Sequence, residues 1–449
     1  HLEKMVDRCE DPSISWANSD YFRDLFRGDP SFDSKKNPQG IAGAIAAWEE
    51  KSEEYRTLAP AVNMRYHTCT IEGQTDGCVR LGVISDMSNG FVNLQGLETL
   101  NRALLKGDLE TASTLRKDMA KEIINVWKNE SKNKNIDASA GFALKQLGYT
   151  VEEIIQIKTL FSKGKKIDDV LLSLNKNKVD HVMRVLSETI EQRTEVMQWQ
   201  FLQLVTDHAS RLTSEDVNEG LMKMLHVCLL CQDSKSVDGT GWYHNEENEM
   251  LDMAAIFEKF DGKKLIADAK GPFIDELGNI HIPPSKVFPK NQEITVRTIF
   301  ISNSVQGGTK NEGTQKEIND IAVQKLKSLS SSDNFEVLLG GDKTSYSTAA
   351  NLADLAMEEG FKTSTGCLSA KDRTGLVCAF ITDRIMKNHH FPMKARIKFL
   401  RNQLKKDSPA VRVIIDNTRA LIMKIKPFFI EGITKDTKNV KSFFVRSVV

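Results

Sequence analysis

The segment from Gly366 to Gly375 holds a cysteine, Cys367, and an arginine, Arg373, with five residues between them. This spacing lets a loop curl so that successive backbone N–H groups point inward, and a following helix adds the positive end of its dipole. Such a cradle fits a phosphate monoester, and the planar guanidinium of Arg373 matches two phosphate oxygens. The same field favours the thiolate of Cys367, which can attack phosphorus to form a phosphocysteine that water hydrolyses. The segment therefore predicts a cysteine-dependent phosphatase.

Neighbouring residues have predicted supporting roles. Thr374, or alternatively Ser369, can donate a hydrogen bond to the departing sulfur. The leaving alkoxide needs a proton, and Asp372 carries the nearest carboxyl group, although an Asp at a helix start can instead cap backbone N–H groups. The alternative proton donors are Asp342 and Asp86. We expect substrate contacts from the rest of the segment and from one loop lysine: Leu368, Ser369, Ala370, Lys371, Thr374 and Lys310.

Lys310 belongs to the glycine-rich loop of residues 303–313, which also carries Asn311 and Glu312. This loop follows a predicted strand, and ligand sites in open α/β sheets gather at the ends of strands. An ordinary surface turn is the alternative interpretation of the loop.

The composition limits the class of protein. With 449 residues, the chain is long enough for two or three domains. Hydrophobic residues make up 40% and the formal net charge is +0, which argues against a dedicated nucleic-acid binder. The seven cysteines argue against a disulfide framework and for a reducing compartment. The chain has no run of about 18 apolar residues, so no transmembrane segment is expected. It begins with His1 and shows no signal-peptide pattern, so we expect a fragment of a longer protein.

No metal or other cofactor is expected. Cys228 and Cys231 are spaced like metal ligands, but no second cysteine pair stands nearby. We interpret them as small apolar residues on a buried helix face. The phosphate loop and Arg373 already neutralise the phosphoryl charge, so the predicted chemistry does not need a metal ion.

Hydrophobic periodicity predicts a succession of elements. Two runs between Met64 and Asp86 flank a glycine-containing turn and indicate a β-hairpin or paired strands. From about Leu97 to Cys231 the apolar spacing is helical, with a capping box at Thr150 and Glu153. Strand patterns return later, and two of these runs end in glycine before a predicted helix. The later predictions are strands at 294–301 and 335–339 and helices at 179–205, 317–329, 345–359 and 376–386.

Strands that alternate with helices predict an α/β fold with right-handed crossovers. We expect a cysteine-phosphatase-like catalytic domain with a mixed sheet flanked by helices, plus an inserted α-helical appendage. The catalytic domain is predicted to be discontinuous, with residues 1–95 and 255–449, and the mainly helical appendage to span residues 96–254. A consecutive middle domain is the alternative arrangement.

The run from Cys367 to Gly375 resembles the signature of inositol polyphosphate 4-phosphatases and of CX5R phosphoinositide phosphatases of the SopB, IpgD, SidF and SidP type, which are bacterial effectors. The Asp before the Arg is also found in myotubularin and Sac lipid phosphatases. Typical protein tyrosine phosphatases lack it and have His where this chain has Gly366. By this similarity, Cys367 is the nucleophile, Arg373 the phosphate clamp and Asp372 the acid, and Lys371 contacts a further ring phosphate.

One position departs from the family pattern, because Leu368 stands where the family commonly has Lys. Each lost charge-assisted contact costs roughly 1.5–3 kcal/mol, so we expect lightly phosphorylated lipids. The SidP-type similarity implies removal of the 3-phosphate from phosphatidylinositol 3-phosphate, with the 3,5-bisphosphate as a second substrate. The alternatives are an inositol 4-phosphatase, a phosphatase of soluble inositol phosphates or phosphoproteins, and a non-catalytic module that binds a membrane or a host protein.

The resemblance also implies a location and partners. It implies a secreted bacterial effector that acts in the host cell, peripheral on endosomal or vacuolar membranes, with a phosphoinositide headgroup as its ligand and no nucleic acid. A host protein could bind the helical appendage. The basic region 384–449 could hold an anionic membrane at about 1 kcal/mol per cation, or could be a solvated helix face.

Overall fold

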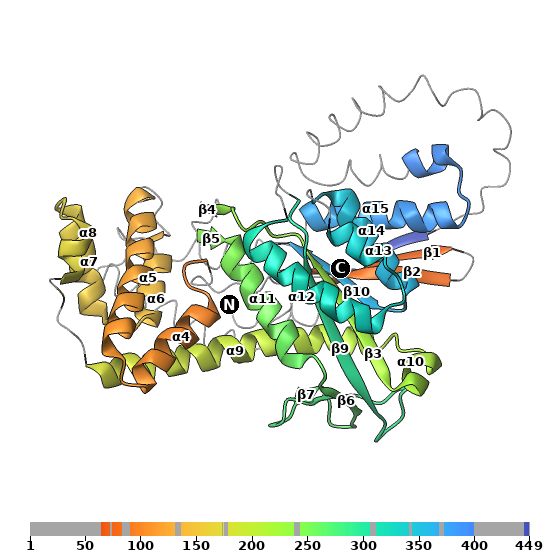
Figure 1. Cartoon of the computed structure of the whole chain (residues 1–449), viewed down its shortest axis with the longest axis horizontal. Coiled ribbons are helices and arrows are strands. Elements are labelled where there is room, and N and C mark those ends of the chain that lie inside the picture. Colours follow the sequence, from red (N-terminus) through yellow and green to blue (C-terminus); the bar gives the residue numbers. More distant parts are fainter. Residues whose placement is uncertain are drawn as a thin grey trace, which may run out of the picture.

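The computed structural model describes residues 64–71, 74–82, 90–130, 136–172, 174, 178–237, 243–305, 311–340, 344–367, 372–398 and 444–448. Within these residues the chain forms a mixed α/β fold around a nine-stranded sheet with the strand order β11-β1-β2-β10-β3-β9-β6-β8-β7 (Figure 1). Its strands are β1 (Met64–Ile71), β2 (Gln74–Gly82), β3 (Leu221–Cys228), β6 (Lys264–Ala267), β7 (Phe273–Ile274), β8 (Ile280–Ile282), β9 (Glu293–Ser302), β10 (Lys362–Cys367) and β11 (Phe444–Val448). β4 (Lys235–Val237) and β5 (Tyr243–Asn245) pair separately.

Four parallel strands form the middle of the sheet. β10 lies between β2 and β3, and β3 pairs in turn with β9. β1 and β11 extend one side as antiparallel strands, and β6 continues the other side antiparallel to β9. Because the four central strands run the same way, their carboxyl ends meet at one edge of the sheet, where ligand sites of such folds gather.

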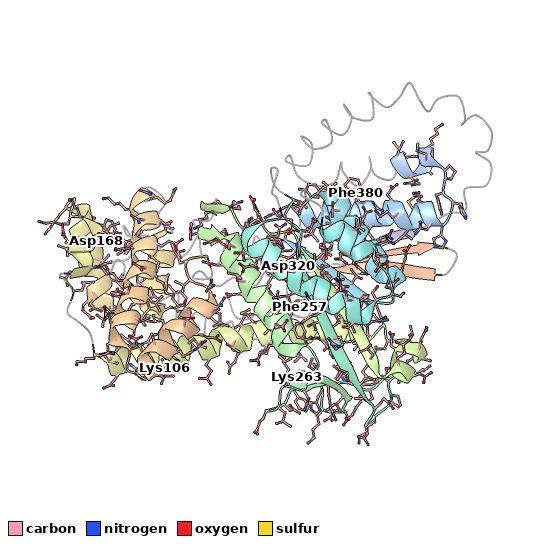
Figure 2. All side chains as sticks on the ribbon, viewed as in Figure 1. Lys106, Asp168, Phe257, Lys263, Asp320 and Phe380 are labelled. Carbon is pink, nitrogen blue, oxygen red and sulfur yellow. The ribbon has the colours of Figure 1, made fainter. Side chains whose placement is uncertain are left out.

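Helices cover both faces of the central strands. On one face, the second half of α9 (Val179–Ala209) and α11 (Glu246–Phe260) pack against alternate strand residues such as Met222 and Met224. Phe257, which Figure 2 labels on α11, packs against β9. Its ring centroid lies 5.5 Å from that of Phe300. The other face packs on Leu225 and Val227, through α12 (Gly313–Leu329), α13 (Asn334–Leu339), α14 (Tyr346–Glu358) and α15 (Asp372–Asn388).

A second group of helices has a core of its own, centred on fully buried Trp127. The first half of α9 belongs to this group, so one long helix joins it to the sheet (Figure 1). A buried ion pair between Arg193 of α9 and Asp252 of α11, 2.8 Å long, adds to this connection. The other members are α4 (Leu94–Leu105), α5 (Leu109–Asn129), α6 (Ile136–Gln146), α7 (Val151–Ser162) and α8 (Ile167–Leu172).

Several sequence predictions are confirmed. The early runs are the antiparallel pair β1 and β2, and the run at 294–301 is β9. Thr150 and Glu153 form both hydrogen bonds of the capping box at the start of α7. The predicted helices at 179–205, 317–329, 345–359 and 376–386 correspond to α9, α12, α14 and α15. A mixed sheet flanked by helices is likewise observed.

Two predicted elements are wrong. The run Phe335–Leu339, expected as a strand, is helix α13, because a short apolar run does not distinguish the two states. Residues 221–228, expected to be helical, form the central strand β3. After α10 (Ser214–Glu219), Gly220 adopts a φ of 66° and ends the helix. From Met224 to Cys228 every residue of β3 is buried, so both faces carry buried side chains and the usual strand alternation of apolar and polar residues is lost.

β3 thus comes from within residues 96–254, the range expected for the helical appendage. How the chain divides into domains stays a prediction, as does the catalytic nature of the sheet-containing part.

In the described part of the chain, no helix has both the length and the apolar character needed to cross a bilayer.

Candidate active site

Cys367 is the last residue of β10 and stands at the carboxyl edge of the four parallel strands. Its side chain is 2% exposed, and its Cα lies opposite Gly82 of β2. On the other side, the carbonyl of the preceding Gly366 accepts a hydrogen bond from the Leu229 N–H at 2.7 Å. Strand pairing on both sides therefore fixes the backbone that carries the thiol. After residues 368–371, which lie outside the described part, α15 begins.

Arg373 lies in the first turn of α15, and its guanidinium group is anchored from one side. Nη1 donates to Glu246 Oε2 at 2.7 Å and to the Leu229 carbonyl at 3.0 Å, and Nη2 donates to Glu246 Oε1 at 2.5 Å. Glu246 is the first residue of α11, is 4% exposed, and also accepts a bond from the Cys231 N–H at 2.8 Å. This double hydrogen bond orients the arginine at the strand edge.

These hydrogen bonds leave one edge of the Arg373 guanidinium group without a partner among the described residues. A guanidinium has five N–H donors, and the three bonds above use three of them. Among the described residues, the Nε–H and the second Nη2–H have no hydrogen-bond partner. These two donors form the pair that matches two oxygens of a phosphate. Burial opposes the charge of Arg373, but Glu246 and nearby Cys367 raise its pKa, so the group stays cationic.

Thr374 follows Arg373 in the same helical turn. It is fully buried, and its Oγ1 has no hydrogen-bond partner among the described residues. A buried hydroxyl without a partner is costly, so its retention calls for an explanation, and a bond to a ligand or a reacting atom would supply one. This fits the predicted hydrogen bond from Thr374 to the sulfur.

The glycine at 366, which departs from the tyrosine phosphatase pattern, has a steric cause. A Cβ added there would lie 2.4 Å from the Leu81 carbonyl oxygen and 3.0 Å from Cε1 of His226 on β3. The His226 ring is held by a 2.9 Å hydrogen bond between Nδ1 and Ser364 Oγ. Burial lowers the pKa of His226 to about 3, so the ring is neutral at physiological pH. An imidazole from the neighbouring strand thus lies beside position 366.

Replacing Gly366 with Ala is expected to destabilise the protein by about 1–3 kcal/mol or more, because the new methyl group meets backbone on a paired strand. Urea unfolding measures this loss. Gly96→Ala in α4 is the matched control, since its nearest atom is the flexible Met119 Cε at 3.0 Å. Equal stability of the two variants would contradict the steric explanation.

Several predicted site residues fall outside the described part of the chain: Leu368, Ser369, Ala370, Lys371, Lys310, Asp342 and Asp86. Asp372 is the first residue of α15, but its side chain is not described. Asn311 donates to the Leu339 carbonyl at 2.6 Å and accepts from Asn319 Nδ2 at 3.0 Å. Its amide therefore fastens the loop to α12 and α13. The predictions for the other residues stay open.

The predicted basic membrane-contact region is described only in part, because residues 399–443 lie outside. Arg396 is engaged by Asp383 of α15 through two bonds of 2.8 and 2.6 Å. Arg396, a cation of the region 384–449, is therefore already paired within the protein.

Sequence reasoning missed two carboxylates at the start of α11, Glu246 and Glu249. The sequence does show a cluster of acidic residues here, in the first turn of α11. Such a cluster is ambiguous, because acidic residues in a first turn also complement the helix dipole. Nothing local in the sequence shows that this turn meets Arg373.

Cys228 and Cys231 are not on a helix, since Cys228 ends β3 and Cys231 lies in the loop that follows. Both are buried, as expected, and burial raises the pKa of Cys228 to about 12, so its thiol stays protonated. In the described ranges, no three side chains of His, Cys, Asp or Glu form a group suited to a metal ion.

Comparison of the chain with protein-family models and with curated proteins gives no match.

Proposed function

We propose that this chain is a cysteine-dependent phosphatase that cleaves phosphate monoesters through a phosphocysteine at Cys367. The observation that carries the proposal is the anchored Arg373. Glu246 and Leu229 hold one side of its guanidinium, while the paired donors of the other edge remain for a phosphate. A free guanidinium fork at the ends of parallel strands, beside a buried thiol, is the arrangement that binding of a phosphate ester requires.

The proposed reaction has two steps. The Cys367 thiolate attacks phosphorus in line while Arg373 holds two nonbridging oxygens, and the leaving oxygen takes a proton. Water then attacks the phosphocysteine, and Thr374 Oγ1 donates a hydrogen bond to the departing sulfur. Fixed donors stabilise the charge on the equatorial oxygens without reorganising during the reaction.

The proposed substrate is the 3-phosphate of phosphatidylinositol 3-phosphate, with the 3,5-bisphosphate as a second substrate. This choice is supported by the signature around Asp372 and by the single loop lysine, Lys371, since Leu368 stands where the similar phosphatases commonly have a second lysine. Action of a secreted effector on host endosomal or vacuolar membranes, and binding of a host protein through the separate helical group, are parts of the same proposal.

A substrate panel tests the lipid class. We expect phosphate release from short-chain lipids that carry a 3-phosphate, in the presence of a chelator, and at least tenfold slower release from lipids that carry only a 4- or 5-phosphate. Release confined to other isomers would retain the cysteine chemistry and contradict the 3-phosphate assignment. No release from any phosphate ester would contradict the proposed function.

A further inference from the structure

Glu249 of α11 has a free carboxyl oxygen in the interior. The side chain is 0% exposed, and Oε1 lies 3.0 Å from Nδ1 of His244 on β5. Oε2 has no hydrogen-bond partner among the described residues. A buried carboxyl oxygen without a partner costs free energy, so its retention calls for an explanation.

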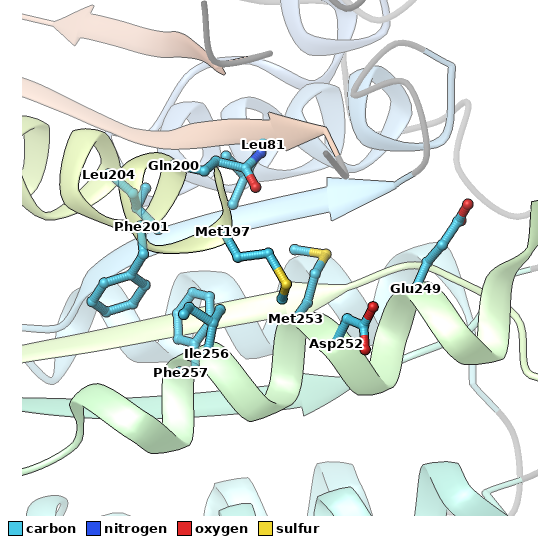
Figure 3. Close-up of a pocket in the computed structure, with 10 residues that line it drawn as sticks. All are labelled: Leu81, Met197, Gln200, Phe201, Leu204, Glu249, Asp252, Met253, Ile256 and Phe257. Atoms are coloured by element: carbon cyan, nitrogen blue, oxygen red, sulfur yellow. The ribbon is translucent and has the colours of Figure 1, made fainter. Parts of the chain in front are cut away.

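Glu249 lines a small pocket with room for about one water-sized group. Most of the lining is apolar and comes from α9 and α11, with Leu81 from β2. Figure 3 shows Glu249 at one end of this pocket, with its carboxyl group turned away from Phe201, Ile256 and Phe257. Glu249 therefore lies at the end of the pocket away from its aromatic side chains.

This pocket adjoins the candidate active site. Leu81 is the strand partner of Gly366, and Gln200, also in the lining, donates to the Gly82 carbonyl at 2.8 Å, opposite Cys367. On α11, Glu249 stands three residues after Glu246, so the two lie on the same helix face about one turn apart. Glu249 therefore lies within roughly one helical turn of the carboxylate that binds Arg373.

The surroundings favour the neutral acid. Burial raises the pKa of Glu249, and Glu246 on its own helix raises it further, whereas His244 of β5 and Arg373 of α15 lower it, with a net increase. Asp252 lines the same pocket but is paired with Arg193 of α9. When the His244 Nδ1–H donates to Oε1, the proton of the neutral carboxyl group sits on Oε2.

We propose that Glu249 is the proton donor to the leaving group, an inference that rests on the proposed function. Oε2–H gives its proton to the ester oxygen as the bond between phosphorus and that oxygen breaks and the bond from Cys367 forms. The carboxylate then accepts a proton from the water that hydrolyses the phosphocysteine, which restores the acid. Each turnover thus consumes one ester and one water and releases an alcohol and phosphate.

The other buried carboxyl groups nearby do not have a free oxygen. Both oxygens of Asp252 are bonded, Oδ1 to the Leu94 N–H at 2.7 Å and Oδ2 to Arg193 at 2.8 Å. Both oxygens of Glu246 bind Arg373. Among these three acids, Glu249 is the one with a carboxyl oxygen that has no hydrogen-bond partner among the described residues. In this proposal Glu249, rather than Asp372, supplies the proton.

The test compares two esters that differ in their need for a proton. An alkyl phosphate such as a short-chain phosphatidylinositol phosphate leaves as a basic alkoxide, whereas p-nitrophenyl phosphate leaves as a stabilised phenolate. We expect Glu249→Gln to lower kcat for the alkyl ester by about 10²–10⁴-fold and for the nitrophenyl ester by less than about tenfold. Glu247→Gln is the matched control on the same helix. Its carboxylate accepts from Thr314 at 2.7 Å, and both rates should stay within about twofold of the wild type.

The wild-type pH profile supplies a test that does not depend on folding of the variant. The alkyl ester rate should fall as pH rises through the pKa of the acid, and the nitrophenyl rate should not show this limb. Equal losses on both esters in Glu249→Gln, or pH profiles of the same shape, would overturn the role of Glu249 while Cys367-dependent hydrolysis stands. If the wild type hydrolyses neither ester, the proposed function fails and this inference with it.

Discussion

Replacing Cys367 with Ser is expected to lower phosphate release by about four or more orders of magnitude. A serine hydroxyl at the same place is not ionised at neutral pH, and in the described part of the chain no base is hydrogen-bonded to this side chain to activate it. The side chain is buried at the end of a paired strand, and Ser is nearly the same size, so the fold should persist. Steady-state kinetics and thermal unfolding of the same sample measure both effects.

Cys378 offers a matched control within α15. Its Sγ lies 3.4 Å from Sγ of Cys78, in the core that α15 forms against the sheet, and a serine there keeps a hydrogen-bonding group. Cys378→Ser should retain activity within a few fold. Comparable activity in Cys367→Ser and the wild type would contradict a thiolate nucleophile.

Replacing Arg373 with Met is expected to cost both stability and activity. It leaves the Glu246 carboxylate buried, with the Cys231 N–H as its remaining described partner, and uncompensated buried charges cost about 3–5 kcal/mol. It also removes the donors proposed for the phosphate, so activity should fall at least 10²–10³-fold, roughly the cost of one lost oxyanion donor. Urea unfolding and kinetics provide the two measurements.

A second variant separates the two roles. In the double variant Arg373→Met with Glu246→Gln, no buried charge is left unpaired, so most of the lost stability should return. Activity should not return, because the phosphate donors are still missing. If the double variant recovered activity together with stability, Arg373 would be a structural residue and not a phosphate ligand.

The local part of the site could be predicted from the sequence. Cys367, Arg373 and Thr374 lie within one short segment, where spacing and flanking glycines indicate a strand, a loop and a helix, and the structure has β10 and α15 in these positions. The repeated apolar spacing of α9 was long enough to leave no ambiguity.

The residues that contact that segment could not be predicted, because they are distant in the sequence and only the fold brings them to it. Glu246 precedes Arg373 by more than 120 residues, and the strand order alone brings α11 to the end of β10. The position of His226 beside Gly366 could not be predicted either. Burial on both faces removes the alternation that marks a strand, so the sequence predicts a helix where β3 lies and does not place the His226 ring beside Gly366.

The most direct test of the central claim is to look for the phosphoryl group on Cys367. The protein is mixed with a phosphate ester, quenched within the first turnover and digested, and the peptide that carries Cys367 is examined by mass spectrometry. The account predicts one phosphoryl group on the Cys367 sulfur in the wild type, formed as fast as the alcohol is released, and none in Cys367→Ser. Full-rate turnover with no phosphoryl group on Cys367 at any time would contradict it.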